Sequence, residues 1–424
     1  MRITHLSTKD LAGGAARAAY RLHQGLIQAG CDSKMVVRIK TSGDPTVIEL
    51  VPVNDLMARL RRKIRGRSLS RSRRRLEARP PGASFFSEDR SELDADILQQ
   101  LPGQDVLNLH WVAELFDYGL FFRRVPPNLP MVWTLHDMNP FTGGCHFDDG
   151  CGKYLAQCGA CPQLGSSNPN DFSAKCWHRK KSALDHITKE QLHIVTPSRW
   201  LAGEAQKSDI LAKYPVSVIP YGLDTEIFQP REKQLARGSL GIPPNAKVIL
   251  FVADSTEEKR KGLHKLLQAI EGLEGIEDVL LVCLGRGLEP ASSKIPVKNL
   301  GYVPEDEKLS QVYSATDIFV APSLQDNLPN TILEALACGL PVIAFAVGGC
   351  MDLVQEGQTG LLAKLNDHEH LRAALMTLLQ NPELRTKMSR ASRLAAETNY
   401  SLKTQAARYK LLYKSLISAN AAAR

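Results

Sequence analysis

Short apolar runs that end in polar residues are the feature of this sequence that most constrains its fold. One run occupies 317–323, and another, 341–345, follows a short helix-forming stretch. Unbroken apolar runs of four or five residues are typical of parallel strands that are buried on both faces. Ligands in such sheets bind at the carboxyl ends of the strands, where a helix N-terminus favours anions. The polar loop 325–330 is therefore predicted to be a binding loop.

Two acidic residues frame this loop. Asp326 lies within it, and Glu334 follows eight residues later, inside the predicted helix. A carboxylate at that depth can accept two hydrogen bonds from a vicinal diol such as a ribose. The alternative is that Glu334 faces solvent.

The segment that contains Asp326 and Glu334 resembles the signature of glycosyltransferase family 4, whose members are retaining enzymes with the GT-B fold. The family pattern is Pro-Ser-x-x-Glu, seven residues, then Glu-Ala-x-Ala-x-Gly-x-Pro-Val. Glu334 matches the second Glu, and Asp326 stands where the first would be. The resemblance extends along nearly the whole chain and suggests an enzyme of the bacterial exopolysaccharide or lipopolysaccharide type. It implies an α/β protein whose two Rossmann-like domains have parallel sheets that face a cleft.

The length of 424 residues exceeds what one ordinary core accommodates, so two domains are expected. Pro220, Gly222 and Pro230 indicate a connector between them. By resemblance, residues 1–223 form the acceptor-binding domain and residues 224–400 form the nucleotide-sugar-binding domain. A C-terminal helix at about 401–424 crosses back to complete the first domain.

Candidate binding residues in the first domain follow predicted strands. Gly13 and Gly14 let the backbone approach a ligand, although tight packing of strand on helix explains them equally well. His110 and His136 end two neighbouring strands, on the side where ligands bind. The resemblance implies that the Gly-Gly loop faces the donor sugar and phosphates and that His136 orients the sugar.

A cluster of cations, 259–261, begins a predicted helix in the second domain. Cations are unfavourable at the positive end of the helix dipole unless an anion is near, which a diphosphate would supply. A solvated basic turn is the alternative. The resemblance implies that Lys261 binds the donor diphosphate. Thr256 stands where the family has an Arg, and Arg260 is the proposed substitute.

The roles of the remaining donor-site residues are implied by the resemblance. It implies that Tyr302 and Val303 receive the nucleotide base, chiefly through backbone groups. Asn327 and Asn330 begin the helix that faces the diphosphate, and Glu334 binds the ribose. No metal is required, because Lys261, Arg260 and this helix N-terminus can carry the charge of the leaving diphosphate, while Asp326 contacts the sugar or its phosphate.

A cysteine-rich loop, 142–165, contains four of the nine cysteines: Cys145, Cys151, Cys158 and Cys161. The C-x2-C spacing of the last pair suits a tetrahedral structural zinc, with His146 as a substitute ligand. Reduced thiols or a redox pair are the alternatives. An odd number of cysteines, without an apolar leader at Met1, is expected of a reducing compartment, with cytoplasm as the default.

A basic insertion, 56–81, accounts for all of the net charge of +8, because eleven Lys and Arg residues and one acid lie between Arg59 and Arg79 and the rest of the chain is slightly acidic. Leu56, Leu60 and Ile64 recur at helical spacing, as in an amphipathic helix that lies on an anionic membrane. A solvated basic insertion is the alternative. Nucleic acid is not expected, because aromatic residues do not interleave with the basic ones.

The sequence thus predicts a retaining glycosyltransferase that moves a sugar from a UDP- or GDP-linked donor to a saccharide acceptor. A lipid-linked acceptor in cell-surface polysaccharide synthesis, and attachment to the inner face of the plasma membrane, are the preferred details. No stretch reaches the ~18 apolar residues that a membrane span needs. The alternatives are a sugar-nucleotide 2-epimerase of the same fold and a non-enzymatic membrane or nucleic-acid adaptor.

Overall fold

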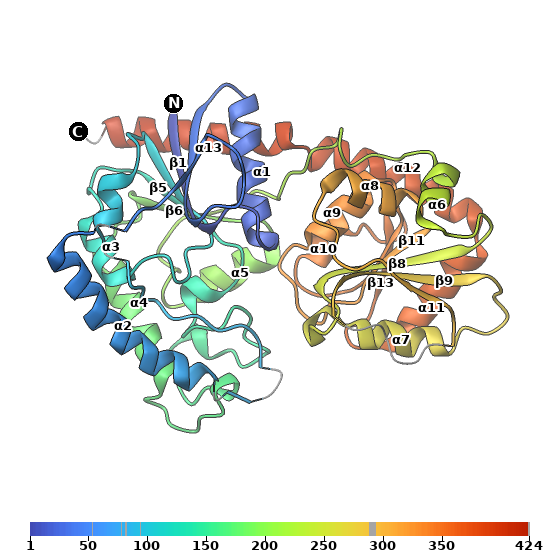
Figure 1. Cartoon of the computed structure of the whole chain (residues 1–424), viewed down its shortest axis with the longest axis horizontal. Helices are drawn as coiled ribbons and strands as arrows, with labels where there is room; N and C mark the ends of the chain where they lie inside the picture. The colour runs from blue at the N-terminus through green and yellow to red at the C-terminus, as the bar shows by residue number, and fades with distance from the viewer. Residues whose placement is uncertain (53, 78, 81–82, 94, 288–293, 423–424) are drawn as a thin grey trace. The chain divides into compact units, whose positions relative to one another are not determined.

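The computed structural model describes residues 1–424 except 53, 78, 81–82, 94, 288–293 and 423–424. The predicted insertion and C-terminal helix therefore each include residues outside the described part, namely Ala78, Pro81, Ala423 and Arg424. The chain forms two compact units (Figure 1). Unit 1 comprises Met1–Pro220 and Ala406–Arg424, and unit 2 comprises Tyr221–Gln405.

Unit 1 is built on a seven-stranded sheet with the order β3-β2-β1-β4-β5-β6-β7, in which all neighbouring strands are parallel. Two of these strands are fully buried four-residue runs, as expected for a sheet covered on both faces. The strands are β1 (Arg2–Lys9), β2 (Asp32–Ile39), β3 (Val47–Glu49), β4 (Val106–Leu109), β5 (Met131–Thr134), β6 (Leu192–Thr196) and β7 (Val216–Val218).

Helices cover both faces of this sheet. Asp117, Asp171 and Ser198 begin three of them by accepting a hydrogen bond from a backbone N–H of the first turn. The helices are α1 (Gly14–Gln28), α2 (Leu56–Glu77), α3 (Tyr118–Arg124), α4 (Phe172–Leu184), α5 (Arg199–Lys207) and α13 (Leu402–Ala422). Short 3-10 turns lie at Ala95–Gln100, Asn139–Phe141, Lys153–Leu155 and Pro162–Leu164.

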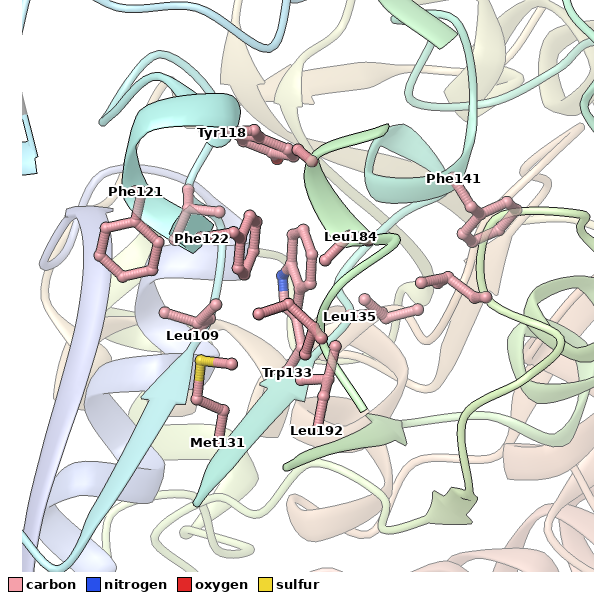
Figure 2. Packing of buried hydrophobic residues seen from close by; sticks show 14 of the residues in the cluster. Leu109, Tyr118, Phe121, Phe122, Met131, Trp133, Leu135, Phe141, Leu184 and Leu192 are labelled. Carbon is pink, nitrogen blue, oxygen red and sulfur yellow. The ribbon is translucent and has the colours of Figure 1, made fainter. Parts of the chain in front are cut away.

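The two faces of the unit 1 sheet differ in chemistry. The face under α3, α4 and α5 is apolar, and Figure 2 shows Trp133 of β5 among Phe122, Leu135 and Leu192. The face under α1 and α13 begins with Ile3, Val106 and Val132 and becomes polar toward the carboxyl ends of the strands. There the buried side chains include those of Asn108, Thr134, His5, His110 and His136.

Unit 2 contains a six-stranded sheet with the order β10-β9-β8-β11-β12-β13, again parallel throughout. Its strands are β8 (Lys247–Ser255), β9 (Val279–Arg286), β10 (Val297–Asn299), β11 (Ile318–Ala321), β12 (Val342–Phe345) and β13 (Gly360–Ala363). Its helices are α6 (Lys233–Leu240), α7 (Leu263–Glu271), α8 (Asp306–Ser314), α9 (Asn330–Ala337), α10 (Cys350–Leu353), α11 (His368–Gln380) and α12 (Pro382–Asn399).

One helix begins later than the sequence predicts. The basic residues Lys259–Lys261 form a 3-10 turn (η5), and α7 starts only at Leu263. Gly262 separates the two with a left-handed φ of 74°. A side chain there would meet the carbonyl oxygen of Pro322 at 1.8 Å from its Cβ, so only glycine fits. This close approach brings the basic turn against the loop that follows β11.

Candidate active site

The centre of the candidate site in unit 2 is an ion pair between two predicted residues. Lys261 follows β8, Asp326 follows β11, and these strands are neighbours in the sheet. The Lys261 Nζ lies 2.7 Å from Oδ2 of Asp326. Both side chains are largely buried, with 20% and 10% of their surfaces exposed. The nearby anion that the basic turn requires is thus, in this structure, the Asp326 carboxylate.

Arg260 ties the same turn to the same loop. Its Nη1 donates to the carbonyl oxygen of Gln325 at 2.7 Å and lies 3.4 Å from Oδ2 of Asp326. Its Nε and Nη2 bind Glu258, and its own carbonyl accepts from the backbone N–H of Leu324. The guanidinium is therefore held in place by both segments.

The Asp326 carboxyl is ionised although it is buried. Burial by itself would raise its pKa, but the positive charges of Lys261 and Arg260 and their hydrogen bonds hold the pKa below its usual value. The hydroxyl of Ser323 lies 3.4 Å from Oδ2 as well. Asp326 also has backbone support, because its carbonyl accepts from the N–H of Gly349.

Helix α9 begins four residues after Asp326 and carries Glu334 in its second turn. Glu334 is 4% exposed, which excludes the alternative that it faces solvent. The hydroxyl of Tyr313 donates to its Oε2 at 3.1 Å. Asn327 is 2% exposed, and Asn330 is the first residue of the helix. The loop and the helix therefore present a short polar series beside Lys261.

The residues predicted to receive the base lie after β10. Tyr302 is half exposed and Val303 is partly buried. The guanidinium of Arg286, at the end of β9, stacks over the Tyr302 ring with its Cζ 4.5 Å from the ring centre. Arg286 was not singled out from the sequence. Its position between Gly285 and Gly287 at a strand end is the signal that could have identified it.

In unit 1, His110 and His136 come together as their positions at strand ends predict. His110 Nδ1 lies 3.1 Å from His136 Nε2, and both rings are buried. Burial lowers the pKa of His136 to about 4, so it is neutral at pH 7. Gly13 precedes the first turn of α1 with a φ of 94°, and no atom in the described part of the chain lies within 4 Å of a Cβ added there. Gly14 is the first residue of that helix.

A second polar cluster in unit 1 surrounds Asp137. Its carboxylate accepts from the Trp111 indole at 2.9 Å and from the backbone of Asn139, and it lies 2.6 Å from Nδ1 of His146. Phe85 stacks on Trp111, contacts the His146 ring at a tilt of 44°, and is 55% exposed. Sequence reasoning missed Phe85 and Trp111, because only the fold brings the loop before β4 to the end of β4.

The four cysteines of the loop 142–165 do not form the predicted zinc site in this structure. Among the described residues, no three His, Cys, Asp or Glu side chains are arranged to hold a metal. Cys145 and Cys161 instead pack with Phe86 and Phe172, and Cys158 accepts a hydrogen bond from the N–H of Gly143. Burial raises the pKa of Cys158 to about 12. All four cysteines are free thiols in this structure, and the structural zinc stays a prediction.

Two sequence profiles of known families match this chain, one mostly in unit 1 and the other in unit 2. A sequence profile described as "Glycosyltransferase Family 4" matches residues 12–227, and one described as "Glycosyl transferases group 1" matches residues 232–395. The D-inositol 3-phosphate glycosyltransferase of Corynebacterium urealyticum is 34% identical over 223 residues, which cover 48% of this chain and 52% of that protein. The chain thus spans about half the length of the curated relatives it matches.

Solved structures resemble the fold over nearly the whole chain. Sucrose-phosphate synthase from Thermosynechococcus elongatus has a TM-score of 0.67 at 20% identity and covers 99% of both chains. Anabaena HepE has a TM-score of 0.68 at 17% identity and covers 98% of this chain and 100% of its own. These similarities establish the GT-B fold. Because a profile of the family matches half of the sequence, the chain belongs to glycosyltransferase family 4.

Proposed function

We propose that the protein is a retaining glycosyltransferase that moves a sugar from a nucleotide-sugar to a saccharide acceptor. The observation that carries the proposal is the pair of cations, Lys261 and Arg260, that buried Asp326 holds beside the start of α9. Breaking the bond between sugar and diphosphate leaves negative charge on the diphosphate. Fixed cations and the N-terminus of a helix stabilise that charge without reorganising during the reaction.

Each polar residue of the unit 2 site then has one role. Lys261 and Arg260 bind the diphosphate, together with the helix start at Asn327 and Asn330. Glu334 accepts the ribose hydroxyls, and the backbone near Tyr302 and Val303 receives the base. Asp326, whose carboxylate is already engaged, positions the two cations rather than the sugar.

A UDP-linked donor is the preferred form. The solved structures of Anabaena HepE include complexes with UDP-glucose and with UDP, and this supports a uridine nucleotide for a chain of the same fold. His136 of unit 1 then contacts the donor sugar, as the family resemblance implies. The exposed Phe85 ring, stacked on Trp111, offers an apolar surface of the kind that covers a sugar ring, which supports a glycan acceptor.

The test of this proposal uses Lys261→Ala and a matched control. Unaltered protein should be stabilised in thermal-shift assays by UDP or GDP and should transfer radiolabel from the matching nucleotide-sugar into a lipid extract. Lys261→Ala should lower kcat by about 10²-fold or more, the usual loss for one well-placed donor to a developing anion. Lys259→Ala removes the same charge from the exposed start of the same turn and should leave kcat unchanged.

Two outcomes would contradict the proposal. Equal activity in Lys261→Ala and Lys259→Ala would contradict the binding of the diphosphate at this site. Conversion of the donor sugar to its 2-epimer, with or without lipid extract, would instead support the epimerase alternative.

We further propose that the acceptor is lipid-linked, as in cell-surface polysaccharide synthesis, and that α2 attaches the protein to the inner face of the plasma membrane. No helix of the described residues is long and apolar enough to cross a bilayer. Helix α2 packs on unit 1 through Ala58, Leu69 and Ser72. Its outer surface exposes four apolar side chains, Leu56, Met57, Leu60 and Ile64, and the basic residues Arg59, Arg61, Lys63, Arg67, Arg71 and Arg74.

This surface combines the two attractions that hold a helix on an anionic bilayer. Each basic residue near the surface contributes about 1 kcal/mol, and apolar side chains enter the interface. Sedimentation with phosphatidylglycerol vesicles should therefore pellet the protein at low salt, and phosphatidylcholine vesicles should not. Leu60→Glu with Ile64→Glu should abolish pelleting. Leu411→Glu, which alters an apolar side chain that is 70% exposed on α13, is the control. Binding by the double variant equal to that of the control would contradict the proposal.

A further inference from the structure

Three buried histidines form a continuous hydrogen-bonded chain across unit 1. They come from three adjacent strands of the sheet: His5 from the middle of β1, His110 directly after β4, and His136 after β5. His5 Nδ1 lies 2.8 Å from His110 Nε2, and His110 Nδ1 lies 3.1 Å from His136 Nε2. The three rings are exposed by 0%, 2% and 9%. Every link therefore joins an Nδ1 to the Nε2 of the next ring.

The chain consists of neutral imidazoles. Burial holds the pKa of His5, His110 and His136 below the ordinary value, and the proximity of the rings to one another lowers the pKa of His110 further. A neutral imidazole has one N–H donor and one acceptor nitrogen. Each of the two hydrogen bonds therefore contains one proton, and both must be donated in the same direction, either from His5 toward His136 or from His136 toward His5.

The far end of the chain decides that direction. His5 Nε2 is buried and has no hydrogen-bond partner among the described residues. A buried N–H without an acceptor is rarer in proteins than a buried acceptor without a donor. The proton of His5 is therefore assigned to Nδ1, which donates to Nε2 of His110. His110 then carries its proton on Nδ1 and donates to Nε2 of His136, which leaves the proton of His136 on Nδ1.

We propose that His5 and His110 are positioning residues that fix His136 as its Nδ1–H tautomer and hold its ring in one orientation. The inference rests on the proposed function, in which His136 meets the donor sugar. In water the Nε2–H tautomer of histidine is favoured, so the chain reverses the ordinary preference. His136 then meets a substrate oxygen as a hydrogen-bond donor through Nδ1, and it is not a base at that nitrogen. The ligand group that it selects is a sugar hydroxyl or a phosphate oxygen that can accept.

The test begins with the unaltered protein and needs no variant. Two-bond ¹H–¹⁵N correlation spectra of ¹⁵N-histidine-labelled protein at pH 7 distinguish the two tautomers of each ring. His5, His110 and His136 should all show a protonated Nδ1. An Nε2–H pattern for His136 would overturn the inference.

Variants of the middle residue then connect the tautomer to the reaction. His110→Leu removes both links, and it should return His136 to a mixture of tautomers and lower kcat/KM roughly five- to tenfold, the effect of one neutral hydrogen bond. His110→Gln can accept from His5 and donate to His136, and should restore most of both properties. His193→Leu alters a partly buried histidine of β6 that binds Ser217 and is not one of the three hydrogen-bonded histidines. It should change neither the His136 tautomer nor kcat/KM.

The outcomes separate the two proposals. An unchanged His136 tautomer in His110→Leu, or equal losses of kcat/KM in His110→Leu and His110→Gln, would overturn the positioning role. Absence of turnover with every nucleotide-sugar in the unaltered protein, together with the predicted tautomers, would overturn the proposed function and not the geometry of the chain.

Discussion

At the scale of single residues, Gly262 determines how closely the basic turn approaches Asp326. Its φ of 74° is unfavourable for any other residue, and an added Cβ would lie 1.8 Å from the Pro322 carbonyl oxygen. We expect Gly262→Ala to lower the free energy of unfolding by about 3 kcal/mol, from about 1 kcal/mol of backbone strain and about 2 kcal/mol of steric overlap. Urea denaturation measures the change.

Gly275→Ala is the matched control for this prediction. Gly275 has a nearly identical φ of 70°, also in unit 2, but no atom of the described residues lies within 4 Å of an added Cβ. This variant should show only the strain of about 1 kcal/mol. Equal losses of stability in the two variants would mean that the contact with Pro322 does not constrain the turn.

At the scale of elements, α13 is held on the unit 1 sheet by two buried tyrosines. Asn108 Nδ2 donates to the Tyr413 hydroxyl at 2.7 Å, and Thr134 Oγ1 lies 3.0 Å from the Tyr409 hydroxyl. Tyr413→Phe leaves the buried Asn108 amide without this acceptor, which should cost about 1–3 kcal/mol of unfolding free energy. Tyr302→Phe, at a half-exposed tyrosine, should cost less than about 0.5 kcal/mol. A loss for Tyr413→Phe as small as for Tyr302→Phe would show that the hydroxyl does not hold the helix.

Several of the helices and strands could be predicted from the sequence. The buried runs of β11 and β12 and the helical spacing of Leu56, Leu60 and Ile64 each identify their element, because periodicity is local. The meeting of Lys261 and Asp326 was also predictable, since both follow buried strands of one parallel sheet and such strands end at the same edge.

The parts that could not be predicted depend on the order of the strands. His5 lies in the middle of a strand and reaches His110 only because β1 is the neighbour of β4, which no local pattern reveals. Phe85 and Trp111 meet for a similar reason. The cysteine spacing allowed zinc, but spacing does not determine whether four side chains point toward one centre, and here Cys145 and Cys161 pack among aromatic rings.

At the scale of the whole molecule, the buried histidines should make the two units respond differently to acid. Burial lowers the pKa of five histidines in unit 1, namely His5, His23, His110, His136 and His193, and of one in unit 2, His264. Such a group takes up its proton in the unfolded chain before it does so in the folded one. Stability is therefore complete above the unfolded pKa of about 6.5 and falls as the pH drops below it toward the lower folded pKa of each histidine.

The distribution of tryptophan makes this difference measurable. All four tryptophans lie in unit 1, so their fluorescence reports unit 1, whereas far-UV circular dichroism reports both units. Between pH 7 and pH 5.5 the thermal midpoint from fluorescence should fall further than the midpoint from circular dichroism. The carboxyls of Glu88 and Asp117 act in the opposite direction, because burial raises their pKa, but two such groups cannot offset five histidines. Parallel decreases of the two midpoints would mean that the histidines of unit 1 are not kept neutral by the fold.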